Sequence, residues 1–202
     1  MDVAGQLRLL RAVHRVLDRA PLFQPRMPRT GRPMSVRMSN CGALGWVSDK
    51  DRGYRYEPCH PMTGEPWPPM PRQLIALWRQ VAPGAALPEA CLINWYGPDS
   101  RMGLHVDRDE ADFSAPVVSV SLGADAWFRI GNTNRGGVTE RLLLRSGDVV
   151  LLGGASRLAY HGVDRILPGT SDLVPEGGRI NLTLRRVTAS QALPTTSTGP
   201  LA

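Results

Sequence analysis

A succession of short segments rich in β-branched and aromatic residues fills the second half of the chain. This feature restricts the possible folds more than any other. Each segment is followed by a turn signal, a pattern typical of strands rather than of helices. The chain from residue 90 onward is therefore predicted to form an all-β core. The predicted strands are Cys91–Tyr96, Gly103–Val106, Pro116–Leu122, Ala126–Ile130, Glu140–Leu144, Asp148–Leu152 and Arg179–Val187.

The region before this core predicts two helices and irregular structure. Helices are expected over about Val3–Arg19 and over Leu74–Val81, the second ended by Pro83 and Gly84. Residues 21–33 are rich in proline and arginine and read as an extended segment. Residues 34–71 are dense in glycine, proline and aromatics, which favours loops and short strands.

The 202 residues, 42% of them hydrophobic, suffice for one substantial core. We expect a single domain, 1–202, in four parts: an N-terminal helix over about 1–20, a region of short elements over 26–89, the β core over 90–187 and a tail over 188–202. The tail has no charged residue and many Ser, Thr and Pro residues, so disorder is expected there.

Cysteine spacing and hydropathy bear on the compartment. Cys41, Cys59 and Cys91 lie far apart without a CxxC pair, which indicates neither a disulfide framework nor a cysteine zinc site. No apolar run approaches the roughly 18 residues of a membrane span, and no signal peptide is recognisable. We expect a soluble, cytoplasmic protein without a membrane partner.

Basic residues outnumber acidic ones, and the excess is uneven. The formal net charge is +6, and residues 1–100 carry 13 basic and 8 acidic side chains, against 11 and 10 in residues 101–202. The segment Arg26–Arg37 holds four arginines and no acid, which would attract a polyanion. Because Lys50 is the only lysine, a general bias toward arginine is the alternative, although it does not explain the asymmetry.

A histidine and an aspartate two residues apart form a candidate metal site. On a strand, His105 and Asp107 would point to the same face, and His161 follows later in the chain. Two histidines and one carboxylate make the facial triad of non-haem iron(II) oxygenases, which leaves coordination positions open. The alternative is that these histidines are ordinary core or surface residues, because the HxD pattern is common.

The last predicted strand alternates polar and apolar residues without a break. This period places Arg179, Asn181, Thr183 and Arg185 on one face. Two guanidiniums and an amide on one face would bind a dicarboxylate, because arginine grips a carboxylate at two points. An amphipathic edge strand with a solvated polar face is the alternative.

Taken together, these motifs resemble the AlkB family of iron(II)- and 2-oxoglutarate-dependent nucleic-acid demethylases, in particular its bacterial DNA-repair branch. The resemblance covers about Met34 to Arg186. Its motifs are Asn94-x-Tyr96, Leu104-His105-x-Asp107-x-Asp109-Glu110, Pro116 to Gly123, Gly147-Asp148-Val149, Ser156-Arg157-Leu158, Tyr160-His161-Gly162 and Arg179-x-Asn181-Leu182-Thr183-x-Arg185.

The resemblance implies a mainly β fold, a double-stranded β-helix with a jelly-roll-like core, an N-terminal helix and a nucleotide-recognition lid. It implies that His105, Asp107 and His161 bind Fe(2+), with 2-oxoglutarate and O2 as cosubstrates. Arg185 would hold one carboxylate of 2-oxoglutarate and Arg179 the other. Asn94, Tyr96 and Asn181 would complete the hydrogen bonds of 2-oxoglutarate.

The resemblance also assigns the region 26–89 to the lid and gives substrate roles to five residues. Trp46 would stack on a flipped base, opposite His105, and the alternative is a core anchor. Tyr54 and Arg135 would contact phosphates, and Asp109 with Glu110 would read the exocyclic amine of the base. The implied substrate is alkylated DNA, single-stranded favoured, and possibly RNA, bound by a monomer.

Three departures from the best-known bacterial pattern concern substrate preference: Trp95 stands where an arginine is familiar, Leu152 where a tryptophan is familiar, and the loop between Trp46 and Tyr54 is one residue longer. None of them touches the iron or cosubstrate motifs. A 2-oxoglutarate oxygenase acting on a protein or a small molecule is the alternative function. A metal-free nucleic-acid-binding module is disfavoured by the complete histidine and aspartate set.

Overall fold

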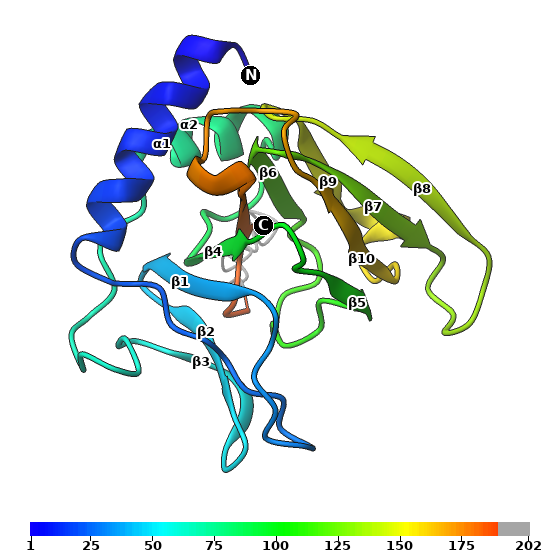
Figure 1. Cartoon of the computed structure of the whole chain (residues 1–202). Helices are drawn as coiled ribbons and strands as arrows, with labels where there is room; N and C mark the ends of the chain where they lie inside the picture. Colours follow the sequence, from blue (N-terminus) through cyan, green and yellow to red (C-terminus); the bar gives the residue numbers. More distant parts are fainter. Residues whose placement is uncertain (190–202) are drawn as a thin grey trace, which may run out of the picture.

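Two antiparallel β-sheets form the centre of the molecule in the computed structural model, which describes residues 1–189 (Figure 1). The larger sheet has the strand order β1-β4-β11-β6-β9, and the smaller has the order β5-β10-β7-β8. A separate hairpin consists of β2 and β3. The strands are β1 (Arg37–Gly42), β2 (Gly45–Asp49), β3 (Gly53–Glu57), β4 (Ala90–Tyr96), β5 (Met102–His105), β6 (Val117–Gly123), β7 (Asp125–Gly131), β8 (Thr139–Leu144), β9 (Val149–Leu152), β10 (His161–Leu167) and β11 (Arg179–Arg185).

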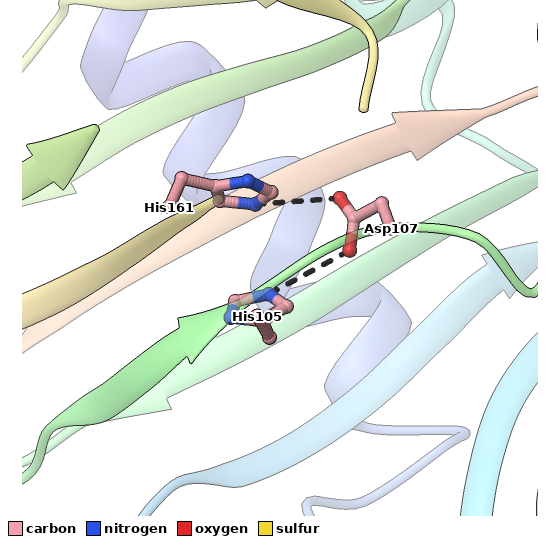
Figure 2. A group of neighbouring side chains, drawn as sticks. All are labelled: His105, Asp107 and His161. Atoms are coloured by element: carbon pink, nitrogen blue, oxygen red, sulfur yellow. Dashed lines mark ion pairs between the residues drawn. The ribbon is translucent and has the colours of Figure 1, made fainter. Parts of the chain in front are cut away.

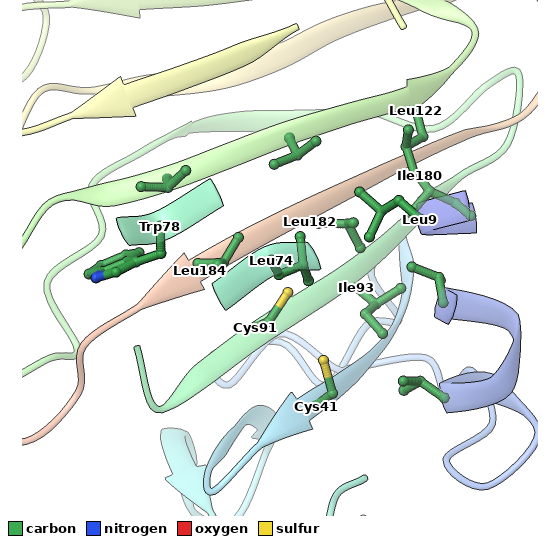
Figure 3. Close-up of a cluster of buried hydrophobic side chains, with 14 of the residues drawn as sticks. Leu9, Cys41, Leu74, Trp78, Cys91, Ile93, Leu122, Ile180, Leu182 and Leu184 are labelled. Atoms are coloured by element: carbon green, nitrogen blue, oxygen red, sulfur yellow. The ribbon is translucent and has the colours of Figure 1, made fainter. Parts of the chain in front are cut away.

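Two helices cover the outer face of the larger sheet. Helix α1 (Val3–Leu17) begins at Asp2, whose carboxylate accepts a hydrogen bond from the Gly5 N–H at 2.7 Å, and α2 is Arg72–Val81. Their apolar faces pack on side chains from β4, β6 and β11 (Figure 3). The fully buried members labelled there are Leu9, Cys41, Leu74, Trp78, Cys91, Ile93, Leu122, Ile180, Leu182 and Leu184.

A second cluster lies between the sheets. Tyr96 of β4 packs in it with Phe128 and Ile166 of the smaller sheet. Strand β11, at the middle of the larger sheet, therefore turns Ile180, Leu182 and Leu184 to the helices and its alternate side chains to the space between the sheets. This arrangement is a jelly-roll-like core and confirms the predicted fold class.

The predicted helices and strands occur, with two differences. Strand β10 was not predicted, because a register shift between Val163 and Arg165 interrupts its alternation. The expectation that Asp107 lies on a strand with His105 was wrong, because β5 ends at His105. Most of the predicted tail lies outside the described residues. Within residues 1–189, no helix combines the length and apolar character that crossing a membrane requires.

Candidate metal centre

Three potential metal ligands, His105, Asp107 and His161, point toward one another (Figure 2). His105 ends β5, His161 begins β10, and the two residues are paired neighbours in the smaller sheet. Their Nε2 atoms lie 3.6 Å from Oδ1 and 3.5 Å from Oδ2 of Asp107, respectively. One ligand atom from each residue lies within 4.8 Å of the others. The hydrogen-bonded pairing of two strands thus brings together residues that are far apart in sequence.

Backbone carbonyls fix the orientation of both imidazoles. Nδ1 of His105 lies 3.0 Å from the Gly103 carbonyl, and Nδ1 of His161 lies 2.9 Å from the Ala159 carbonyl. Because a carbonyl can only accept, each Nδ1 carries the proton, and each Nε2 presents a lone pair to the centre. Burial lowers the pKa of His105, which favours its neutral, metal-binding form.

Asp107 completes a donor set that fits a cation. Burial would raise the pKa of its carboxyl, but Arg185 and the two histidines outweigh burial and hold that pKa far below its usual range. Oδ1 accepts from Arg185 at 2.7 Å, whereas Oδ2 is buried and has no hydrogen-bond partner among the described residues. An unpaired buried carboxylate oxygen facing two imidazole lone pairs is costly, and a divalent cation would satisfy all three. Iron(II) suits this donor set.

The polar face of β11 is buried rather than solvated. Arg179 is 1% exposed and donates to the Ala124 carbonyl at 2.9 Å and to the Ser121 hydroxyl. Asn181 donates to the Ser119 hydroxyl at 2.7 Å. The alternative of a wet edge strand is therefore wrong, because β11 lies between β4 and β6.

Strand β4 adds two of the predicted cosubstrate residues to this face. Asn94 is the partner of Asn181, and Tyr96 is the partner of Arg179, so these four side chains project from one surface of the sheet. Tyr96 is 2% exposed, and burial raises the pKa of its hydroxyl above the usual value.

Unpaired buried polar atoms concentrate at this site. In the part of the chain that the structure describes, five buried side-chain nitrogen or oxygen atoms lack a hydrogen-bond partner. Four of them are Oδ2 of Asp107, Oδ1 of Asn94, Nε of Arg179 and Nε of Arg185; the fifth belongs to Trp78. Because buried polar groups are nearly always satisfied, this concentration indicates a site for polar ligands.

Arg185 belongs to a buried ionic network next to the triad. Besides Asp107, it donates to Oε1 of Glu110 at 2.9 Å and to the Tyr56 hydroxyl at 3.1 Å. Arg157 donates to Oε2 of Glu110 at 3.1 Å and to the Asp107 carbonyl at 2.7 Å. Sequence reasoning gave no role to Arg157 or Tyr56. The only signals were the place of Arg157 in the motif Ser156-Arg157-Leu158 and the position of Tyr56 two residues after Tyr54.

The predicted substrate residues divide into three groups. Trp46 of β2 and Tyr54 of β3 stack with ring centroids 5.3 Å apart, and the Trp46 indole N–H donates to Asp109 at 2.9 Å. Glu110 is instead buried, with both carboxylate oxygens engaged by the network. Arg135 lies on the exposed loop between β7 and β8.

Comparison with known proteins gives relatives of one kind. The family model described as the 2OG-Fe(II) oxygenase superfamily matches residues 3–185. A Caulobacter vibrioides protein named alpha-ketoglutarate-dependent dioxygenase AlkB homolog is 54% identical over 186 residues, which cover 92% of this chain and 84% of the relative. Alpha-ketoglutarate-dependent dioxygenase AlkB of Escherichia coli is 44% identical over 183 residues, covering 89% and 83%. The solved structure of OsALKBH1 matches with a TM-score of 0.73 and 32% identity, covering 90% of this chain and 91% of that one.

Proposed function

This chain belongs to the AlkB family of the 2OG-Fe(II) oxygenase superfamily, and from this premise we infer that it demethylates N-alkylated nucleobases in nucleic acid oxidatively and so repairs alkylation damage. The favoured lesions are of the 1-methyladenine and 3-methylcytosine type. The supporting observation is the buried cluster of unpaired polar atoms on Asp107, Asn94, Arg179 and Arg185, beside two oriented histidines.

Iron(II), when bound by His105, Asp107 and His161, supplies the oxidation of an N-methyl C–H bond by O2, coupled to decarboxylation of 2-oxoglutarate to succinate. The hydroxymethyl group on the base nitrogen then leaves as formaldehyde. The protein contributes ligands, orientation and exclusion of water.

Arginines on β11 hold the dicarboxylate in this proposal. Arg185 takes one carboxylate of 2-oxoglutarate and Arg179 the other, while Asn94, Tyr96 and Asn181 donate the remaining hydrogen bonds to its oxygens. The guanidinium of each arginine is already fixed by neighbouring acceptors, so little side-chain entropy is lost on binding.

The β2–β3 hairpin receives the base. Trp46 offers the ring face not covered by Tyr54 for stacking, and its bond to Asp109 places that carboxylate beside the stacked base. Asp109 reads the exocyclic amine, while Glu110 acts mainly by holding Arg185 and Arg157. Tyr54, which is 46% exposed, and Arg135 contact phosphates.

We propose further that the protein is a monomeric, single-domain cytoplasmic enzyme and that it prefers single-stranded DNA, with RNA as a second substrate. A flipped base costs less to extract from an unpaired strand, which supports the strand preference.

Methylated oligonucleotides provide the test. Single-stranded DNA and RNA carrying 1-methyladenine or 3-methylcytosine are incubated with the protein, iron(II) and 2-oxoglutarate, and the products are measured by mass spectrometry. The proposal expects equal amounts of demethylated base, succinate and formaldehyde. Succinate released without any demethylation would refute it and would favour the protein or small-molecule alternative.

A further inference from the structure

A strongly basic hollow of about 450 Å³ lies on the smaller sheet, outside the site described above. Arg101, Arg129, Arg141 and Arg165 line it, and Asp164 is the one acidic residue in its lining. Four guanidiniums against one carboxylate leave a net charge of three positive. Nothing in the proposed iron or cosubstrate chemistry uses these residues.

The hollow opens on the outer face of the sheet, away from the metal ligands. On β7, Ala126 and Phe128 face the core between the sheets, so Arg129 between Phe128 and Ile130 points outward. Arg141 of β8 is paired with Arg129 and shares its face. Arg101 precedes β5, which is the edge strand of the sheet.

Asp164 organises half of the arginines and leaves the other half free. Its Oδ2 accepts from Nε and a terminal nitrogen of Arg129 at 3.1 and 2.8 Å and lies 3.6 Å from Nε of Arg141. Among the described residues, the exposed side chains of Arg101 and Arg165 have no hydrogen-bond or ion-pair partner. Asp164 thus holds the guanidinium groups of Arg129 and Arg141 in place, while those of Arg101 and Arg165 are available to a ligand.

The position of the hollow suits a polyanion that also reaches the iron site. Arg101 is four residues before His105, and Arg165 is four residues after His161. At about 3.3 Å per residue, four residues of extended chain span at most about 13 Å, so each arginine lies within that distance of a metal ligand. That distance equals the axial rise of about four nucleotides in one strand of duplex DNA, at about 3.4 Å each.

The basic N-terminal segment approaches the same edge. The Ser35 hydroxyl donates to the Arg101 carbonyl at 2.8 Å, and the Arg101 N–H donates back to that hydroxyl at 3.1 Å. The segment Arg26–Arg37 therefore joins the hollow at β5. This contact places the backbone of the arginine-rich segment beside Arg101, at the start of the edge strand β5.

We propose that this hollow is a second phosphodiester-binding site, which holds the nucleic-acid backbone a few nucleotides from the base under repair. The inference rests on the proposed function and extends it to the footprint of the substrate. Arginine forks match phosphate oxygens, and neutralised phosphates release counterions. The hollow therefore adds affinity for long substrates and none for substrates that end at the lesion.

The test compares an Arg101→Ala/Arg165→Ala double variant with an Arg8→Ala/Arg11→Ala control on the exposed face of α1, across the larger sheet (Figure 1). Binding of a methylated trinucleotide, a longer single strand and its duplex is measured over a range of salt concentrations, and demethylation of each is measured alongside. The hollow variant should lose most of the affinity gained with length. Its slope of log affinity against log salt should fall by about 1.4 to 1.8, from about 0.7 to 0.9 per contact.

Each outcome has one meaning. Loss with the longer single strand assigns the hollow to the damaged strand, and loss with the duplex alone assigns it to the complementary strand. Arg101→Lys/Arg165→Lys should retain the length effect, because a lysine also neutralises a phosphate. A folded alanine variant that matches the control on all three substrates overturns the proposal. A wild-type protein that demethylates none of them refutes the proposed function instead.

Discussion

Replacing Trp46 separates a nucleobase substrate from other oxygenase substrates. Trp46→Ala removes a half-buried ring that stacks on Tyr54 and packs at the edge of a core cluster. Loss of base stacking should cost about 1 to 3 kcal/mol of substrate binding, or about 5-fold to about 140-fold in affinity. Full burial would cost about 3 to 5 kcal/mol of folding stability on truncation, so a half-buried ring should cost roughly half as much.

Trp46→Phe separates the contribution of the stacking surface from that of the indole N–H. Phenylalanine keeps a stacking surface but loses the indole N–H that donates to Asp109 at 2.9 Å, a hydrogen bond worth about 1 kcal/mol. The phenylalanine variant should therefore recover most of the lost affinity for methylated single strands. It should not recover the full preference for bases that carry an exocyclic amine, because Asp109 loses the bond that holds it in place.

The assay combines thermal melting with demethylation rates over a range of oligonucleotide concentrations. The stacking role predicts a higher substrate requirement with unchanged affinity for 2-oxoglutarate. A folded Trp46→Ala variant with a normal rate and a normal substrate requirement would contradict the reasoning. Activity loss that follows unfolding alone would instead make Trp46 a core anchor.

The remaining predictions concern the buried centre. Alanine in place of His105, Asp107 or His161 should abolish demethylation and weaken iron binding measured by titration, because each supplies one of three ligands; wild-type succinate production by any of them would remove the triad from the mechanism. Arg185→Lys should raise the 2-oxoglutarate requirement far more than the nucleic-acid requirement, since lysine lacks the planar guanidinium that grips a carboxylate at two points. Steady-state kinetics with each substrate varied in turn measures both requirements, and an unchanged 2-oxoglutarate requirement would contradict this role. Glu110→Gln removes the carboxylate that pairs with both Arg185 and Arg157 in the buried network. Calorimetry should find that the free energy of unfolding falls by about 3 to 5 kcal/mol. In iron-free protein, the lowered pKa of Asp107 gives stability that is complete above its ordinary pKa of about 4 and falls as the pH drops below it; an Asp107→Asn variant with the same melting profile below that pH would exclude this source.

Local patterns predicted the fold class and the ligand set because the relevant signals are short in sequence. The HxD spacing and the unbroken alternation from Arg179 to Arg185 can be read directly from neighbouring residues. The pairing of β11 with β4 and β6 then buries a face that, by sequence alone, could equally have been solvated.

The ionic network could not be predicted in the same way, because it depends on contacts between distant residues. Tyr56 and Glu110 are 54 positions apart, and Tyr56 and Arg185 are 129 positions apart. The burial of Glu110, which resemblance had offered as a reader of the base, follows from these contacts. Similarly, strand β10, which carries His161, could not be recognised in the sequence, because its register shift interrupts the alternation of polar and apolar residues.

The link between Tyr56 and Arg185 has a thermodynamic consequence. Tyr56 is the partner of Trp46 across the β2–β3 hairpin, and its hydroxyl contacts the arginine that also binds Asp107. A ligand that engages Arg185 and one that engages the hairpin thus act on a shared set of bonds. If binding of the first ligand changes the affinity for the second by some factor, binding of the second must change the affinity for the first by the same factor. A change in the hydrogen-bond partners of the Arg185 guanidinium should therefore alter the affinity of the β2–β3 hairpin for its ligand.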